Sequence, residues 1–163
     1  MELSPPAPLE ARHRLDGFDS GAPSLDEWLR RRARANQASG ASRTFVVCEG
    51  DQVVGYFSLA SGSINLIAAT GGFRRNMPDP IPVVILARLA VDRRLQGRGV
   101  GQGLFAEAAK RVLLAGESVG VRGLVVHALS VDAAAFYRGL GFEAGAGEPL
   151  TLMLPLGRLR ASL

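Results

Sequence analysis

Apolar residues recur at helical spacing near the start of the chain and predict an amphipathic helix there. Ser24-Leu25-Asp26-Glu27 reads as a capping box, which predicts that the helix begins at Ser24. Gly40 marks its expected end, because glycine commonly follows the last turn of a helix. The buried stripe of this helix is expected to consist of Leu25, Trp28, Leu29 and Ala33.

Extended patterns follow the helix. Residues 44–48 and 53–59 are β-rich runs separated by four residues of turn composition, and they predict an antiparallel hairpin. Residues 62–82 are rich in glycine and proline and predict a long, partly irregular loop. Residues 83–91 form a nearly continuous apolar run, which is typical of a central strand covered on both faces.

The second half of the chain alternates helical and extended patterns. A loop with glycine at every other position precedes the helix-prone residues 104–115. The later expected elements are a strand at 124–129, a helix at 132–140 and a strand at 150–154. This order predicts a single α/β domain over residues 1–163, with a mixed central sheet and flanking helices. Residues 1–15 and 156–163 are candidates for flexible termini.

Composition is that of a globular protein. Hydrophobic residues make up 47% of the 163 positions, enough to bury a core in one domain. The first residues lack the apolar core of a signal peptide, and no apolar run is long enough to span a bilayer, so we expect a soluble, cytoplasmic protein without membrane contact. Cys48 is alone, which excludes disulfides and cysteine-based metal sites, and no metal is expected.

The basic residues are almost all arginine. Lys110 is the sole lysine among 19 basic residues, and the formal net charge is +4. Arginine forks bind phosphates and planar carboxylates better than ammonium groups do. A GC-rich genome would give the same bias, so only local clustering can separate the two interpretations.

The alternating glycines form a loop that can direct backbone N–H groups at an anion, supported by the N-terminus of the following helix. Phosphate is the expected ligand. A Walker loop is excluded because Lys110 follows Ala109 rather than glycine. A dinucleotide fingerprint fails as well, since Gln102 stands where a third glycine should follow Gly97 and Gly99.

The segment Gln96-Gly97-Arg98-Gly99-Val100-Gly101 matches the pattern Q/R-x-x-G-x-G/A and lies between a predicted strand and a predicted helix. In this setting the chain resembles the GNAT acetyltransferases; a structural tight turn is the alternative. The resemblance implies the GNAT acyl-CoA N-acyltransferase fold and acetyl-CoA as co-substrate, with loop amides on the pyrophosphate and strand backbone along the pantetheine arm. The cofactor-binding residues that it implies are Leu89, Ala90, Val91, Gln96, Gly97, Arg98, Gly99, Val100, Gly101, Asp132 and Phe136.

A second segment, residues 128–142, resembles the A-x-x-F-Y-x-x-x-G-F pattern of the same family with its spacing intact. The resemblance places Tyr137 near the thioester sulfur. A phenol with a pKa of about 10 is protonated at neutral pH, so it can donate its proton to the thiolate sulfur, whose acid has a pKa of about 8.5, as that sulfur departs. Tyr137 is therefore the candidate catalytic residue, and a purely structural tyrosine is the alternative.

The expected central strand offers little to deprotonate an acceptor amine. Arg88 occupies a position where a carboxylate base could have stood, and Asp92 comes only at the loop. An α-amino group has a pKa of about 7.7–8.0, so a useful fraction is neutral without a strong base. The pattern favours an α-amine as acceptor, unless an acid from elsewhere in the fold reaches the site.

Three longer stretches, residues 36–46, 73–83 and 88–92, look very like the TacT-type toxins of bacterial type II toxin-antitoxin pairs. The similarity covers roughly residues 8–155. It implies an enzyme that acetylates the α-amino group of aminoacyl-tRNA and so blocks translation. It also implies neutralisation by a ribbon-helix-helix antitoxin, a homodimer, and contact with operator DNA only through that antitoxin.

A tRNA substrate would explain the arginine clusters, because phosphate contacts dominate nucleic-acid affinity. A solvated basic surface is the alternative for each cluster, and Arg93 and Arg94 suit the CoA phosphates equally well. Asn36, Gln37 and Ser42 either line the acceptor site or cap a helix. The substrate-binding candidates are Arg30, Arg31, Arg34, Asn36, Arg74, Arg75, Arg88 and Arg93.

Two other functions stay open on the sequence. A general N-acetyltransferase for small-molecule or protein amines would act on free amines or peptides and ignore charged tRNA. A non-catalytic CoA-binding co-repressor would bind the cofactor and tolerate loss of the Tyr137 hydroxyl.

Overall fold

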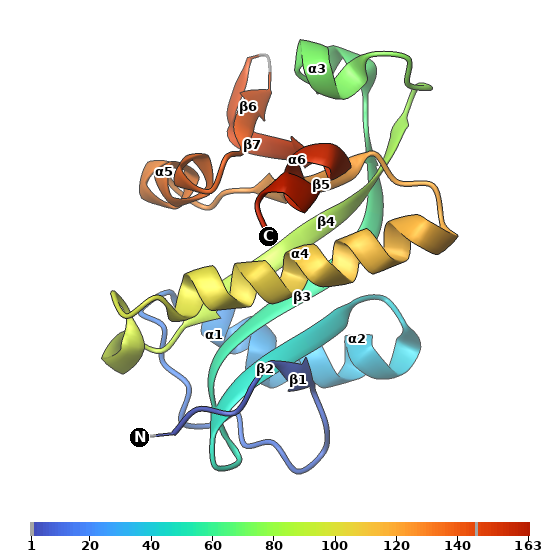
Figure 1. Cartoon of the computed structure of the whole chain (residues 1–163). Coiled ribbons are helices and arrows are strands. Elements are labelled where there is room, and N and C mark those ends of the chain that lie inside the picture. Colours follow the sequence, from blue (N-terminus) through green and yellow to red (C-terminus); the bar gives the residue numbers. More distant parts are fainter. Residues whose placement is uncertain (1, 146) are drawn as a thin grey trace. The chain divides into compact units, whose positions relative to one another are not determined.

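The computed structural model describes residues 2–145 and 147–163 (Figure 1). Contacts divide the chain into two compact units. The first comprises Met1–Ala60 and Ala87–Ala108, and the second comprises Ser61–Leu86 and Ala109–Leu163. Two strands and one helix run from one unit into the other, namely β3 (Gln52–Ile64), β4 (Ile81–Val91) and α4 (Val100–Ser118).

The strands of the described residues form one mixed sheet in the order β1-β2-β3-β4-β5-β7-β6. β4 pairs with β5 in parallel, whereas β1–β2, β2–β3, β5–β7 and β6–β7 are antiparallel. The predicted α/β fold with a mixed central sheet and flanking helices is confirmed. The remaining strands are β1 (Ala7–Pro8), β2 (Arg43–Glu49), β5 (Gly123–His127), β6 (Glu143–Gly145) and β7 (Glu148–Pro155).

The helices match the predicted ones in order, with short additions. The remaining helical segments are α1 (Pro23–Arg31), α2 (Ala33–Ser39), η1 (Leu66–Ala68), α3 (Gly71–Arg74), η2 (Arg93–Leu95), α5 (Val131–Gly139) and α6 (Leu156–Ala161). β1, β6 and α6 are absent from the sequence prediction, because segments this short carry too little periodicity to be recognised.

The first unit is organised around the predicted hairpin of β2 and β3. Neighbouring β3 residues point to opposite sides of the sheet. The open side of Gly55 is met by Leu104 of α4, whereas the Tyr56 hydroxyl donates to the carbonyl of Leu25 in α1 at 2.7 Å. Within this unit, α4 therefore covers one side of β3 and α1 covers the other. As the stripe pattern predicts, Leu29 is fully buried in the core on the α1 side.

The start of the first helix differs from the prediction. The helix begins at Pro23 after Ala22, with no side-chain cap, so the capping box at Ser24 is wrong. Proline at the first helical position has its φ already set for a helix and lacks the N–H that a cap would satisfy. Asp26 instead accepts hydrogen bonds from the backbone N–H and the hydroxyl of Ser20, at 3.1 and 2.6 Å.

The predicted single helix is also interrupted. Arg32 lies between α1 and α2 with φ −119° and ψ −27°, a distorted conformation that still belongs to the right-handed helical region. Gly40 ends α2 with φ 82°, a conformation that favours glycine, so the predicted end of the helical region is confirmed.

The predicted irregular loop at residues 62–82 contains more structure than expected. β3 continues to Ile64, and the segment then forms η1 and α3 before β4 begins. The Thr70 hydroxyl accepts a hydrogen bond from the N–H of Phe73, and the Phe73 ring is buried in the core of the second unit. Arg122 donates to the Phe73 carbonyl at 2.8 Å. The contact with Arg122 and the packing of the Phe73 ring involve residues distant in sequence, which is why local composition did not reveal them.

We expect Gly123→Ala to destabilise the second unit. A Cβ at Gly123 would clash with the backbone carbonyl oxygen of Leu154 on β7, and that backbone cannot move without breaking the β5–β7 ladder. The expected loss is about 3 kcal/mol of unfolding free energy, measured by denaturant titration. Gly120→Ala is the matched control, because its Cβ would enter open space. Equal stability of the two variants would contradict this account.

Candidate functional site

The glycine loop between β4 and α4 has free space beside its glycines, because they carry no side chains. Gly97 and Gly99 have φ of 78° and 82°, values at which residues with a Cβ are strained. A Cβ built on either residue meets nothing within 4 Å. The loop leads directly into α4 at Val100, so the loop amides and the positive end of the helix dipole lie next to each other. This arrangement can hold an anion such as a pyrophosphate, as the sequence predicted.

Asp92 holds the beginning of this loop in place. Its carboxylate accepts hydrogen bonds from the backbone N–H and the Nε of Arg94, both at 3.1 Å, and from the N–H of Asp19 at 3.3 Å. Burial by itself would raise the pKa of Asp92, but these hydrogen bonds hold the pKa below its usual value. Asp92 is therefore a structural anion in a dense network and is not available as a base.

Gln96 closes the same loop through its side chain. Its amide group donates to the carbonyls of Val91 and Ser20, at 2.9 and 2.8 Å. Arg93 forms an exposed ion pair with Asp19 at 3.1 Å. Both residues thus tie the glycine loop to the segment before α1. The Gln96 backbone amide stays the predicted pyrophosphate contact, and Arg93 uses only its Nε on Asp19, so its Nη groups remain for a phosphate.

The end of β4 carries the predicted pantetheine segment. Ala90 is buried in the core of the first unit, and Leu89 and Val91 are half-buried. The parallel pairing of β4 with β5 covers Val84, Ile85 and Leu86, which all precede this segment. The backbone groups of Leu89 and the N–H of Val91 on that strand edge lie beyond the β4–β5 pairing, so they can meet a ligand that pairs like an added strand. The Val91 carbonyl, in contrast, already accepts from Gln96.

Arg88 stands beside this segment in a column of stacked side chains. Its guanidinium lies over the Trp28 ring, 4.2 Å from the ring centre, and Trp28 stacks on Tyr56 at 6.1 Å. Burial lowers the pKa of Arg88, and no acidic residue among the described ones pairs with it. The structure thus fixes a half-buried cation, and no base, at this position of the central strand.

Tyr137 lies on α5 in the second unit. Its ring packs edge-on against Phe136 and Phe142, with centres 5.2 and 5.5 Å away. Burial raises the pKa of Tyr137 to about 12, so the phenol is protonated at neutral pH. Among the described residues its hydroxyl has no hydrogen-bond partner, which leaves the proton free for transfer. Asp132 is exposed in the first turn of the same helix.

The predicted tRNA-binding arginines divide between the two units. Arg74 and Arg75 are exposed at the end of α3 in the second unit, and the others belong to the first. The Asn36 side chain accepts from Arg32 at 3.2 Å, and its backbone carbonyl accepts from the N–H of Ser42. Its role as a substrate contact stays a prediction.

One concave surface was missed by the sequence analysis. His13, Arg14, Leu15, Asp16, Arg30 and Arg34 line a hollow of about 360 Å³ in the first unit, which we name the basic hollow. Two of its arginines were predicted as substrate contacts. The others stand in a stretch without periodicity, and the density of charged residues at positions 10–16 was the only signal that could have indicated them.

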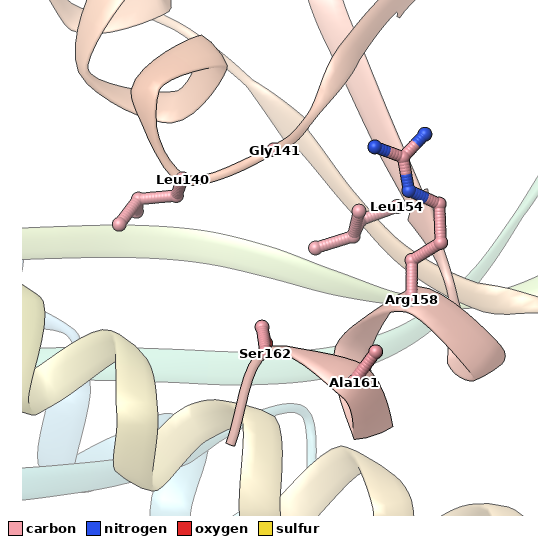
Figure 2. Close-up of a pocket in the computed structure, with 6 residues that line it drawn as sticks. All are labelled: Leu140, Gly141, Leu154, Arg158, Ala161 and Ser162. Carbon is pink, nitrogen blue, oxygen red and sulfur yellow. The ribbon is translucent and has the colours of Figure 1, made fainter.

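A second cavity, of about 240 Å³, lies in the second unit between the end of α5, β7 and α6 (Figure 2). Leu140 and Leu154 provide apolar walls, and Arg158 at its rim pairs with Glu143 at 2.8 Å. None of the predicted site residues lines it.

The part of the chain that the structure describes contains neither a cluster of metal-ligating side chains nor a membrane-spanning helix. Its histidine, cysteine and acidic side chains form no group of three able to hold a metal ion. No helix in the described ranges is long and apolar enough to cross a bilayer.

Comparison with known proteins defines the class. The family model described as acetyltransferase (GNAT) domain matches residues 40–144, so the chain belongs to the GNAT acetyltransferase family. Acetyl-CoA is the acetyl donor that this family membership brings with it.

Individual proteins that are similar to this chain over most of its length are toxins. The chain is 50% identical over 147 residues to the tRNA-acetylating toxin of Mycobacterium tuberculosis, covering 90% of this chain and 89% of the relative. The solved structure of AtaT complexed with acetyl-methionyl-tRNAfMet is 32% identical and has a TM-score of 0.90 over 98% of both chains. AtaT bound to the C-terminus of its antitoxin AtaR and acetyl-CoA is 31% identical, with a TM-score of 0.85 over 99% of this chain and 97% of that one. The predicted resemblance to toxins of this family is confirmed.

Substitution of Gly99 by alanine is expected to weaken acetyl-CoA binding about tenfold, because a Cβ at φ 82° drives the loop out of its anion-binding conformation. Isothermal titration with acetyl-CoA measures the effect. Gly103→Ala, in the first turn of α4 with open space and no positive φ, is the control and should bind normally. An unchanged dissociation constant for Gly99→Ala would show that the loop conformation is not required.

Proposed function

We propose that this chain is a toxin that transfers the acetyl group of acetyl-CoA to the α-amino group of aminoacyl-tRNA, which blocks translation until a cognate antitoxin neutralises it. The 50% identity with a tRNA-acetylating toxin over nine-tenths of the chain carries the proposal. The structure of AtaT with acetyl-methionyl-tRNAfMet supports it, since the acetylated aminoacyl-tRNA is the product that such a reaction gives.

The cofactor role of the first unit follows from its loop and strand. The amides of Gln96 to Gly101 bind the pyrophosphate, helped by the dipole of α4, and the backbone of Leu89 and Val91 pairs with the pantetheine arm. The open space beside Gly97 and Gly99 supports this assignment. Arg98 is exposed in the loop. Asp132 and Phe136 stay predictions as cofactor contacts.

An α-amine as acceptor agrees with the shortage of carboxylates that could deprotonate an ammonium group. Asp26 and Asp92, which are 6% and 3% exposed, are the buried acidic residues among the described ones, and both already accept several hydrogen bonds. On the central strand the chain presents the cation Arg88. A positive charge disfavours a second one, so a neutral α-amine is better tolerated there than a lysine ammonium. Attack by a neutral amine needs no strong base.

Tyr137 completes the chemistry as general acid. When the amine attacks the thioester carbonyl, the C–S bond breaks and the sulfur leaves with the electron pair. The phenol proton of Tyr137 passes to that sulfur, and the proton lost by the new amide restores the phenol through solvent. A buried phenol without a hydrogen-bond partner in the described chain suits this role, because no acceptor competes for its proton.

The decisive experiment follows labelled acetyl from acetyl-CoA into a pool of aminoacyl-tRNA, with deacylated tRNA and a lysine peptide alongside. We expect label on charged tRNA alone, and a kcat about 100-fold lower for Tyr137→Phe at unchanged acetyl-CoA affinity. Tyr56→Phe is the matched control, because its hydroxyl bonds to the Leu25 carbonyl and should affect stability rather than rate.

The other outcomes identify the alternatives. Label on the lysine peptide alone would make the chain a general N-acetyltransferase. Acetyl-CoA binding without transfer, together with partner-dependent DNA binding that Tyr137→Phe leaves intact, would make it a co-repressor.

The rate should depend on pH through the substrate. It should rise with the fraction of neutral α-amine, around a pKa of about 8, and then stay level to about pH 10. The level region follows from Tyr137, whose pKa of about 12 keeps the acid protonated there. Initial rates with an amide-linked aminoacyl-tRNA analogue avoid ester hydrolysis. A fall in rate between pH 8.5 and 10 would argue against this phenol as the acid.

Assembly and location complete the proposal. We propose a homodimeric cytoplasmic protein whose antitoxin has the ribbon-helix-helix fold, and which reaches operator DNA only through that antitoxin. Support comes from the solved AtaT-AtaR complex bound to DNA, whose toxin chain is 31% identical with a TM-score of 0.78 over 96% of this chain and 97% of that one.

A further inference from the structure

We infer that the basic hollow binds a phosphate of the tRNA backbone and so fixes the tRNA on the first unit. This inference rests on the proposed function and adds the place where the nucleic acid is held. It concerns a surface formed by residues 13–16 together with Arg30 of α1 and Arg34 of α2.

The arginines of the basic hollow are held in position by backbone carbonyls. Arg30 donates through Nη1 to the carbonyl of Phe18 at 3.2 Å. Arg34 donates through Nη2 to the carbonyls of His13 and Ala11. Each guanidinium has five N–H donors, so both keep several for a ligand after these bonds. Binding would therefore cost little side-chain entropy, since the forks are already oriented.

The charge in the basic hollow is not neutralised by the protein. Three guanidiniums line it against the single carboxylate of Asp16, and the described residues offer none of these arginines an ion pair. Burial lowers the pKa of His13, whose Nδ1 accepts a hydrogen bond from the N–H of Glu10 at 2.9 Å. The imidazole is thus neutral at pH 7, and the net positive charge comes from the arginines.

A phosphodiester is the ligand that this chemistry favours. Guanidinium forks match the oxygens of a phosphate in two-point geometry, and the volume of about 360 Å³ leaves room for part of an adjoining sugar. Arg31 and Arg32 add further exposed cations to the same helical segment, outside the lining of the hollow. Several guanidiniums without an ion pair suit a polyanion such as tRNA better than an acidic peptide, whose carboxylates are fewer.

Arg14 offers the cleanest test. Its side chain makes no hydrogen bond to the described residues, whereas its backbone is fixed by bonds to Asp51, Gln52 and Val53. Arg14→Gln removes one cation and should leave the fold intact. Arg14→Lys keeps the charge but loses the fork. Arg160→Gln, at an exposed arginine of α6, makes the same charge change far along the sequence and is the matched control.

Binding of tRNA without acetyl-CoA is measured first, by fluorescence anisotropy at several salt concentrations. We expect Arg14→Gln to weaken tRNA binding about fivefold and to lower the salt slope by about one, as loss of one phosphate contact requires. Arg14→Lys should lie between wild type and Arg14→Gln. In the transfer assay the KM for aminoacyl-tRNA should rise while kcat and acetyl-CoA affinity stay unchanged.

Specific results would overturn the inference. Unchanged tRNA affinity and salt slope in Arg14→Gln would do so. Weakened acetyl-CoA binding would instead identify the phosphate as that of CoA, and loss of antitoxin binding alone would identify an acidic peptide. Because tRNA binding is measured separately from transfer, a wild type that binds tRNA without acetylating it would refute the proposed function and leave the hollow as a phosphate site.

Discussion

A buried carboxylate at the end of the central strand is the constraint on which the first unit depends. Asp92 is 3% exposed, and its side chain binds the N–H groups of Arg94 and Asp19, while its own N–H donates to Val54 on β3 at 2.8 Å. One residue thus joins the sheet, the glycine loop and the segment before α1. Replacing it with an apolar residue would leave buried N–H groups without partners, each of which costs free energy.

The segment before α1, residues 11–20, supports two surfaces of the first unit, the glycine loop and the basic hollow. Its later part, at Asp19 and Ser20, supports the glycine loop through Arg93 and Gln96. Its earlier part, from Ala11 to Phe18, supplies the carbonyls that orient Arg30 and Arg34 in the basic hollow. Cofactor loop and basic hollow are therefore built on one irregular stretch of chain, whose rigidity comes from hydrogen bonds rather than regular secondary structure.

The proposed general acid, Tyr137, has no strong general base to match it among the buried side chains of the described residues. Tyr137 is a buried phenol with a raised pKa, and Arg88 is a desolvated cation stacked on Trp28. The two buried acidic residues among the described ones, Asp26 and Asp92, already accept hydrogen bonds. Such a protein is suited to an amine that is largely neutral at physiological pH, as the α-amine of an aminoacyl ester is. On the proposed function, selectivity among amines then follows from electrostatics and from how the phosphates of the tRNA are held.

Short-range patterns in the amino-acid sequence account for part of this structure. Periodicity gave the main strands and helices, and the spacing of Gly97 and Gly99 gave the anion loop, because positive φ values require glycine. These patterns did not give the start of α1, the structure within residues 62–82, or the use of Asp92 and Gln96 as structural ties. Only the tertiary structure decided these features and brought Arg14 beside Arg30 and Arg34, because each depends on hydrogen bonds or packing between residues far apart in sequence, which no local pattern records.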